Sequence, residues 1–418
     1  MAGISDRVAD MLKRRGFLGA AVAGVALGAP EKTELGAKLA SAMSGRVFKR
    51  ELVKEAVVLE SVDLLRIGKS YLVRARAKNG AVGYSEAHST VMAAAYPILV
   101  KKVAPLLVGK DARNIEDLLA EVYLASSNYK WQGLPFWVSV AAVEIAVLDV
   151  LGQVAKQPLG ALIGEVWRQE IPVYRASGNR GNSPEAEIEY LRKQVEETGA
   201  SAIKFRLGAR MRYDEASTKR DLAMIPMTRK VFGKEMAIYA DANGSYDVPM
   251  AVRMGRLMEE QRFGFFEEPV PFDYYEETKQ IADALKIPIA FGEEEMSLRG
   301  FRRIIETGTA QVIQPDLLYF GGMIRSMKVA RMAAVAGLDC TAHMSGGGLG
   351  YLYVAHFASA IRNSGAHQEY KGEDDILPVS SATSSLKCVN GMLKVPSGPG
   401  LGVTIDPGFL SRAEVVRG

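Results

Sequence analysis

Residues 237–269, AIYADANGSYDVPMAVRMGRLMEEQRFGFFEEP, contain two short apolar runs separated by a helical pattern over residues 249–261. The first run ends in Asp241-Ala242-Asn243 and the second in Glu267-Glu268-Pro269. A strand, a crossover helix and a second strand in this order predict a parallel strand pair. Each predicted strand ends in a carboxylate, so this stretch also places acidic groups at one edge of the sheet.

The same alternation continues on both sides of this segment. We expect eight short apolar strands, at residues 171–176, 202–207, 237–243, 264–268, 288–293, 311–316, 339–344 and 367–370. Helical patterns lie between them, as at residues 185–197, 275–285 and 323–336. Eight strands with seven intervening helices predict an α/β fold in which a parallel sheet closes into a TIM-type barrel. An open doubly wound sheet is the alternative, but no glycine-rich dinucleotide loop follows the first strand.

The part of the chain before the barrel has a different pattern. Residues 55–65 and 71–78 alternate as antiparallel strands do, and Asn79-Gly80 predicts a tight turn after them. The Ala- and Val-rich run 138–154 predicts a buried helix. These features predict an N-terminal α+β capping domain at residues 43–170.

The remaining boundaries follow from this division. We expect the catalytic barrel at residues 171–384 and a C-terminal segment at residues 385–418. Residues 396–402, PSGPGLG, cannot form a helix or a central strand. We therefore expect the C-terminal segment to pack back on the capping domain.

The N-terminus has the pattern of an export signal. Arg14 and Arg15 stand directly before an apolar stretch of 13 residues, 17–29. A membrane-spanning helix needs about 20 residues, so this stretch is too short for a retained anchor. With the small-residue site Ala40-Ser41-Ala42, it predicts a twin-arginine signal peptide at residues 1–42 and a periplasmic or otherwise exported protein without a membrane anchor after processing. A basic helix at a cytoplasmic N-terminus is the alternative.

The composition is that of an ordinary globular protein. Apolar residues make up 48% and charged residues 24% of the 418 residues, which excludes disordered, collagen-like and coiled-coil classes. The net charge is +4 and no basic stripe is interleaved with aromatic residues, so we expect no nucleic-acid partner. Cys340 and Cys388 form no disulfide framework and no metal-binding spacing, and Cys340 lies in an apolar run typical of a buried thiol. For the assembly we expect a homo-oligomer.

Polar side chains stand at the ends of the predicted strands from the second to the eighth. In a barrel of this kind the carboxyl ends of the strands face the active site. The residues are Lys204, Arg206, Asp241, Asn243, Glu267, Glu293, Asp316, His343 and Glu369. Interior barrel positions are otherwise apolar, so this recurrence predicts one catalytic site.

Three of these residues predict a metal site. Asp241, Glu267 and Glu293 end consecutive strands at intervals of 26 residues, so their carboxylates lie side by side. Carboxylates this close repel unless a cation lies among them, and hard oxygen ligands suit Mg²⁺ better than Zn²⁺. The alternative is that they cap helices or pair with surface lysines. The neighbouring acids alternate to other directions, so we expect three residues outside the metal site, Glu268, Glu294 and Glu295.

A base is predicted on the opposite side of the ring. His343 has an orienting partner in Asp316, at the end of the preceding strand, which can fix its tautomer and raise its basicity. Lys204 and Arg206 are two residues apart on one strand and therefore share a face. A substrate carboxylate bound to the metal would lie between this cationic pair and the imidazole.

The motifs in this order resemble the enolase superfamily, and within it the mandelate racemase group of the mandelate racemase/muconate lactonizing enzyme family. They are Lys204-Phe205-Arg206, Asp241-Ala242-Asn243, Glu267-Glu268-Pro269, Gly292-Glu293, Pro315-Asp316, Gly321-Gly322, His343 and Glu369. The resemblance, from about residue 53 to the C-terminus, implies a modified (β/α)₇β barrel with an α+β cap, Mg²⁺, and abstraction of the proton α to a carboxylate to give an enediolate held by the metal.

The resemblance also implies roles for two further residues. A protonated Glu369 would donate a hydrogen bond to a substrate carboxylate oxygen, with a salt bridge to Lys371 as the alternative. Asn243 would hold a substrate oxygen or carry the metal shell.

The chain departs from the racemase pattern at Arg206, where much of the group has a lysine that acts as a base. A guanidinium is a poor proton acceptor at neutral pH, so a reaction with His343 as its one base is favoured. We therefore expect dehydration of an acid sugar, the small-molecule carboxylate partner, to a 2-keto-3-deoxy acid, with Lys204, Arg206 and Asn243 binding the substrate. A racemase, epimerase or cycloisomerase on the same scaffold is one alternative, and an exported sugar-acid-binding protein without catalysis is another.

The turn at residues 66–70 is a second departure. It leaves almost no room for the long loop that covers the site in this family. Either the site is open to a larger saccharide acid or a neighbouring subunit closes it. Residues 87–96 and 128–131 are then expected to determine specificity.

Overall fold

The computed structural model describes residues 29–345, 347–372 and 377–417. The chain divides into two compact units, residues 1–34 and 35–418, and the second contains the predicted barrel and cap. The apolar stretch of the predicted export signal lies almost wholly outside the described residues. The predicted cleavage site at residues 40–42 lies within helix α2 (Ala29–Ser44).

The barrel predicted from the sequence is confirmed. Its strands are β4 (Glu170–Ala176), β5 (Ala202–Arg206), β6 (Ala237–Asp241), β7 (Phe265–Glu267), β8 (Ile289–Phe291), β9 (Val312–Ile313), β10 (Asp339–Cys340) and β11 (Gln368–Tyr370). They pair in parallel in chain order from β4 to β10, and β11 pairs with β4. A parallel bridge between Cys340 and Ser364 joins β10 to the chain just before β11 and closes the ring.

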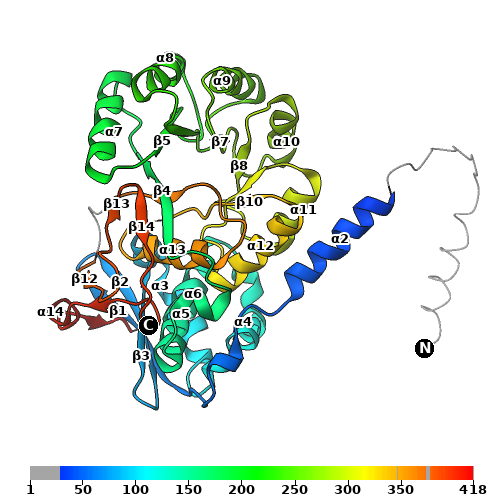
Figure 1. The fold of residues 1–418 in the computed structure, drawn as a ribbon. Helices are drawn as coiled ribbons and strands as arrows, with labels where there is room; N and C mark the ends of the chain where they lie inside the picture. The colour runs from blue at the N-terminus through cyan, green and yellow to red at the C-terminus, as the bar shows by residue number, and fades with distance from the viewer. Residues whose placement is uncertain (1–28, 346, 373–376, 418) are drawn as a thin grey trace, which may run out of the picture. The chain divides into compact units, whose positions relative to one another are not determined.

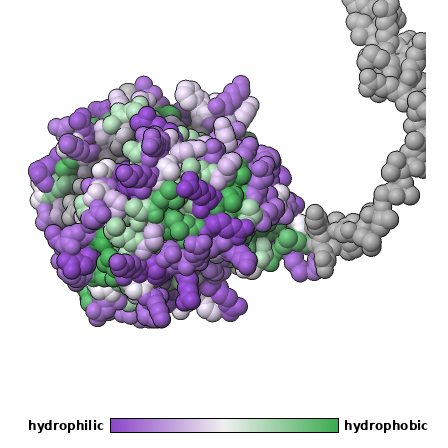
Figure 2. Space-filling view, turned by 90° about the horizontal axis from the view of Figure 1, so that it is seen from above, coloured by the Kyte–Doolittle hydropathy of each residue, from purple (hydrophilic) through white to green (hydrophobic). Residues whose placement is uncertain are grey.

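Seven helices alternate with these strands and lie outside the ring (Figure 1). They are α7 (Pro184–Thr198), α8 (Glu215–Phe232), α9 (Val248–Glu260), α10 (Tyr275–Ala284), α11 (Leu298–Thr307), α12 (Met323–Val335) and α13 (Gly350–Ala360). Except for α13, whose residues are all buried, these helices carry polar residues on their outer faces. Seen from above, hydrophilic side chains surround smaller apolar areas (Figure 2). The apolar faces pack inward against the strands, as amphipathic helices do.

The two ends of the barrel differ in chemistry. A layer of aromatic rings fills the interior below the site, where Tyr239 stacks on Phe265 at a centroid distance of 4.1 Å and Tyr174 meets both edge-on. This apolar floor forces the polar residues of the strands to the carboxyl-terminal end.

All the observed strands except β4 are shorter than the predicted ones. Strand β9 ends at Ile313 and β10 at Cys340, so Asp316 and His343 lie in the loops that follow, joined by an isolated parallel bridge. Strands β6 and β8 end just before residues with positive φ, Asn243 (42°) and Gly292 (123°). The predicted dyad therefore lies on loops held by a rigid barrel.

The capping domain is built on an antiparallel sheet of β1 (Leu59–Ile67), β2 (Ser70–Ala77) and β3 (Val82–Ala87). Helices α3 (Ser89–Ile98), α4 (Ile115–Leu124) and α5 (Leu134–Ala155) follow, and α5 packs against the sheet. Helix α5 is long and apolar enough to cross a membrane, but 89% of its apolar window is buried inside the protein. This is the predicted buried helix.

The C-terminal segment contacts both parts of the molecule. Its hairpin, β13 (Cys388–Val389) and β14 (Met392–Lys394), pairs with barrel strand β4, and only β16 (Glu414–Val415) joins the capping sheet, beside β1. We expected residues 385–418 to pack on the capping domain, and the structure shows that they pack on the barrel as well. Cys340 is buried as predicted, and Cys388 is buried as well.

Candidate active site

The structure brings the three predicted metal ligands together. Asp241 ends β6, Glu267 ends β7, and Glu293 follows β8. One ligand oxygen from each lies within 4.8 Å of the others, and all three side chains are buried.

The chemistry of these oxygens fits Mg²⁺. Among the described residues, Oδ2 of Asp241 and Oε2 of Glu293 are buried oxygens without a hydrogen-bond partner. Burial, together with the nearby Glu267 carboxylate, raises the pKa of Glu293. Lys204 pairs with Glu267 and Arg206 with Asp241, but two cations do not balance three buried carboxylates, and a hard divalent cation supplies the remaining charge through oxygen ligands.

Lys204 is not at the surface of the active-site cavity. Its ammonium is fully buried, with Nζ 2.8 Å from both oxygens of Glu267 and 3.3 Å from Oε1 of Glu369. Burial lowers the pKa of Lys204, but the charges of Glu267 and Glu369 outweigh it and raise the pKa above its ordinary value. The structure thus places Lys204 as a cation that neutralises a metal ligand rather than as an exposed substrate-binding group.

Arg206 faces the cavity from the same strand. Its guanidinium contacts Oδ2 of Asp241, and Nη1 lies 3.3 Å from Oδ1 of Asn243. Burial lowers the pKa of Arg206, but the surrounding carboxylates, Glu369 foremost, raise it above the ordinary value. A guanidinium held in this way remains charged and cannot accept the α-proton.

The predicted dyad is formed. Nδ1 of His343 lies 2.7 Å from Oδ2 of Asp316, and Nε2 lies 3.4 Å from Oε2 of Glu293. Asp316 is fixed in turn, since its other oxygen accepts hydrogen bonds from the backbone of Leu318 and from the hydroxyl of Ser345. Burial lowers the pKa of His343, but Glu293, Glu369 and Asp316 raise it above its ordinary value.

Glu369 is surrounded by cations. Burial raises its pKa, but Lys204, Lys371, His343 and Arg206 together hold it well below the usual range. Its Oε2 accepts a hydrogen bond from Met344 N. Its ion pair is with Lys204, while Lys371 donates to the carbonyl of Met344. The protonation expected of Glu369 with substrate bound stays a prediction.

A cavity of about 390 Å³ opens above these groups. Its walls carry the guanidinium of Arg206, the imidazole of His343 and one acid of the metal site, Glu293. They consist of Arg206, Arg210, Met211, Asn243, Glu268, Phe272, Glu293, Glu294, Tyr319, His343, Ser345 and Lys371. This volume is in the range of small-ligand sites.

Glu268 and Glu294 lie outside the metal triad, as expected, but both line this cavity. Glu268 has φ of 41°, which breaks the alternation of strand β7 and turns its carboxylate to the same side as that of Glu267. Glu294 follows the positive-φ Gly292 by two residues and also reaches the cavity. Glu295 lies outside both the triad and the cavity lining and accepts hydrogen bonds from Ser297 N and Tyr275. Alternation alone could not reveal that the other two face the cavity, because it assumes an extended backbone.

Asn243 is reached by a further arginine that the sequence did not single out. Its side-chain oxygen accepts hydrogen bonds from Arg206 and Arg180, and its amide nitrogen lies 3.3 Å from Oε2 of Glu268. Burial lowers the pKa of Arg180 to about 10. Asn243 thus stands between two cations and an acid on the cavity wall, which suits binding of a polar substrate group.

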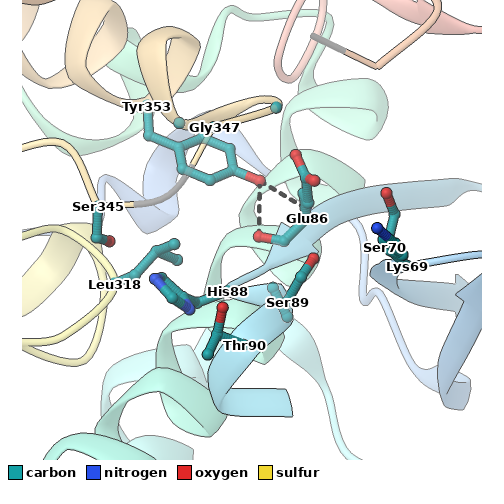
Figure 3. Close-up of a pocket in the computed structure, with 13 residues that line it drawn as sticks. Lys69, Ser70, Glu86, His88, Ser89, Thr90, Leu318, Ser345, Gly347 and Tyr353 are labelled. Atoms are coloured by element: carbon teal, nitrogen blue, oxygen red, sulfur yellow. Dashed lines mark hydrogen bonds between the residues drawn. The ribbon is translucent and has the colours of Figure 1, made fainter. Parts of the chain in front are cut away.

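One of the two expected specificity segments reaches the site. His88, Ser89 and Thr90 line a second cavity beside the first (Figure 3). Residues 128–131 do not reach either cavity. Asn128 is buried and donates to two backbone carbonyls, and Trp131 lies beneath Lys102.

Comparison with known proteins identifies this arrangement. The N-terminal domain family of mandelate racemase and muconate lactonizing enzyme matches residues 62–164, and the enolase C-terminal domain-like family matches residues 187–409. The chain belongs to the mandelate racemase group of the enolase superfamily. It is thereby an enzyme of that superfamily, and the triad, the dyad and the capping sheet occupy the positions that the resemblance implied.

Named relatives of this enolase-superfamily enzyme include two activities. Arabinonate dehydratase of Saccharolobus solfataricus is 30% identical over 334 residues, with 79% of this chain and 86% of that protein covered. D-galactarolactone cycloisomerase of Agrobacterium fabrum is 24% identical, with 80% of this chain and 88% of that protein covered. A mandelate racemase/muconate lactonizing protein from Paracoccus denitrificans, crystallised with magnesium, superposes with a TM-score of 0.79 at 27% identity, over 86% of this chain and 99% of that one. The buried triad is consistent with a Mg²⁺-dependent enolase-type reaction.

Proposed function

We propose that this enzyme dehydrates a sugar acid to a 2-keto-3-deoxy acid. The observation that carries the proposal is the asymmetry of the cavity. His343, held by Asp316, presents Nε2 on one side, while the corresponding position on the other side is Arg206, a permanent cation. A reaction that needs one base fits this arrangement, and the likeness to arabinonate dehydratase supports it.

The residues assign the steps of the reaction. Nε2 of His343 takes the proton from C2, and the electron pair moves into the carboxylate to give an enediolate. Mg²⁺, when bound by Asp241, Glu267 and Glu293, neutralises charge that develops on the carboxylate oxygens. The C3–O bond then breaks as the pair returns, and the departing hydroxyl takes the proton from His343 and leaves as water. The enol that remains tautomerises to the 2-keto acid.

Arg206, Asn243 and Lys371 provide the binding contacts on the cavity wall. Since Arg206 already touches a metal ligand, its guanidinium is placed to hold a substrate oxygen beside the metal. Lys204 contributes indirectly, because its hydrogen bonds keep the Glu267 carboxylate charged and fixed beside the other two metal ligands.

A cycloisomerase is the second candidate, favoured by the named relative from Agrobacterium fabrum. It would use the same base but release no water. Incubation of open-chain aldonic acids with Mg²⁺ separates the two, because a substrate without a lactone ring gives a semicarbazide-reactive 2-keto acid only by loss of water. We expect keto-acid formation, abolished in His343→Asn. The matched control is His367→Asn, because the ring of His367 lies near the barrel floor, beside Tyr239 and away from the cavity.

We also propose that the protein is exported, with processing before residue 35. The twin-arginine pattern supports export. Leu39 is fully buried among Phe301 and Val329 of the barrel helices, so removal of residues 1–42 would uncover an apolar surface. N-terminal sequencing of the periplasmic form tests this: a start at residue 43 would contradict it.

We propose that the protein is a homo-oligomer, as expected from the sequence. Light scattering of the purified protein tests this, and a mass of one chain would contradict it.

A further inference from the structure

A second cavity of about 330 Å³ lies where the capping domain meets the barrel (Figure 3). The cap contributes Lys69 and Ser70 from the start of β2, and Ser89 and Thr90 from the start of α3. The barrel contributes Leu318 and Ser345 from the loops that carry the catalytic dyad. The cavity exists because only Gly68 and Lys69 separate β1 from β2, so no loop fills the space.

The second cavity adjoins the catalytic one. Ser345 lines both, and its hydroxyl lies 3.0 Å from Oδ1 of Asp316. Tyr319 lines the catalytic cavity, and its hydroxyl lies 3.3 Å from Nε2 of His88, which lines the second. The second cavity is therefore the neighbouring space into which a substrate longer than one sugar unit would extend.

The lining offers hydroxyls and an ammonium to a ligand. Among the described residues, no hydrogen bond engages the side chains of Ser70, Ser89 or Thr90, and no ion pair engages Lys69. By contrast, Tyr353 is already bound to the backbone of Glu86, as the dashed lines of Figure 3 show. Unengaged hydroxyl donors and acceptors around a hollow of this size match the hydroxyls of a sugar ring.

We propose that the substrate is a disaccharide acid: an aldonic acid that carries a second sugar on O4. This rests on the proposed dehydration. The acid unit occupies the catalytic cavity, and the second sugar occupies the cavity lined by Ser70, Ser89 and Thr90, which has a similar volume. O4 is the first position whose substituent survives, because C2 loses the proton and C3 the hydroxyl. The glycosidic bond is not broken.

The test compares matched substrates. Aldonic acids made by oxidation of β-1,4-linked disaccharides with glucose, galactose, mannose, xylose or arabinose at the reducing end are assayed with Mg²⁺ beside the corresponding monosaccharide acids. We expect at least one disaccharide acid to have a kcat/KM about tenfold above that of its monosaccharide acid. If every converted monosaccharide acid reacts faster than its glycosylated form, the inference is overturned while the proposed function stands. Failure of both panels to form keto acid contradicts the proposed function itself.

A cavity-filling variant tests the location. Thr90→Trp places an indole in the second cavity, and Leu124→Trp, at an exposed position of α4 outside the cavity lining, is the control. We expect the ratio of disaccharide to monosaccharide kcat/KM to fall about tenfold in the first and to stay at the parent value in the second. Ser89→Leu repeats the test if Thr90→Trp unfolds at a lower temperature than the parent. An unchanged ratio in a folded cavity variant overturns the inference.

Discussion

Nδ1 of His343 lies 2.7 Å from Oδ2 of Asp316, although the two residues belong to loops after different strands. The backbone bridge between the same residues fixes the two loops to each other, so the dyad is held both by side chains and by main chain. Because Nδ1 is engaged, the other ring nitrogen faces the cavity and the metal carboxylates. The imidazole is thus oriented as a base before any substrate arrives.

This geometry predicts which residue exchanges the α-proton. In deuterium oxide, His343→Asn should lower the exchange at the α-carbon by about 10²–10⁴-fold, the contribution of a positioned general base. Arg206→Met should keep measurable exchange and mainly raise KM, because it removes a binding contact. NMR of recovered substrate measures both. Exchange that survives in His343→Asn and vanishes in Arg206→Met would reverse the assignment.

Metal binding should stabilise the fold through the triad. When the Mg²⁺ concentration is a hundred times its Kd, the free energy of unfolding should rise by about 2.7 kcal/mol, which is measured as a rise in Tm. Glu293→Gln should lose most of this rise and the activity, because it removes one ligand charge. Glu294→Gln is the matched control: it lines the cavity beside the triad and should keep the rise. An equal Tm response in both variants would show that the metal binds elsewhere.

Much of this arrangement could be predicted from the sequence, and the failures share one cause. The repeated strand–helix pattern predicted the barrel, and the strand-end positions of Asp241, Glu267 and Glu293 predicted the triad. That Glu268 lines the cavity could not be predicted, because its positive φ is invisible to an alternation rule. The charges around Glu369 could not be predicted either, because Lys204, Arg206 and His343 come from distant parts of the chain. Local pattern predicts elements, whereas charge state depends on tertiary neighbours.

A buried acid in the cap should make stability depend on pH. Glu144 on α5 accepts hydrogen bonds from Met323 N and Ile324 N at the start of α12, and burial raises its pKa to about 8 from 4.5. The folded state therefore binds the proton more tightly than the unfolded state. The stabilisation is full below about pH 4.5 and is lost as the pH rises through about 8.

Urea unfolding at pH 5 and pH 8 measures this effect. Relative to the parent, Glu144→Gln should gain stability as the pH rises, by an amount on the order of a few kcal/mol. Glu121→Gln, an exposed acid on α4, is the control and should track the parent at both pH values. If the two variants respond alike, Glu144 does not titrate in this range.

Residues 396–402 of the C-terminal segment form a strap along α5. This strap should tolerate no side chain at Gly400. Asp149 of α5 accepts hydrogen bonds from Leu401 N and Tyr84 N, both at 2.8 Å, and so joins the strap to the capping sheet. Gly400 has φ of 63°, and a Cβ there would overlap Oδ1 of Asp149. Gly400→Ala must break this junction or move the strap, so we expect a loss of about 2–4 kcal/mol in the free energy of unfolding.

The control separates crowding from backbone strain. Gly68 has almost the same φ, 61°, but a Cβ there meets nothing within 4 Å. Gly68→Ala should therefore lose only about 1 kcal/mol, the strain of a left-handed alanine. Urea unfolding of the two variants gives the difference directly, since both carry the same strain. Equal losses in the free energy of unfolding would mean that the strap moves at little cost and that the hydrogen bonds of Asp149 contribute little to stability.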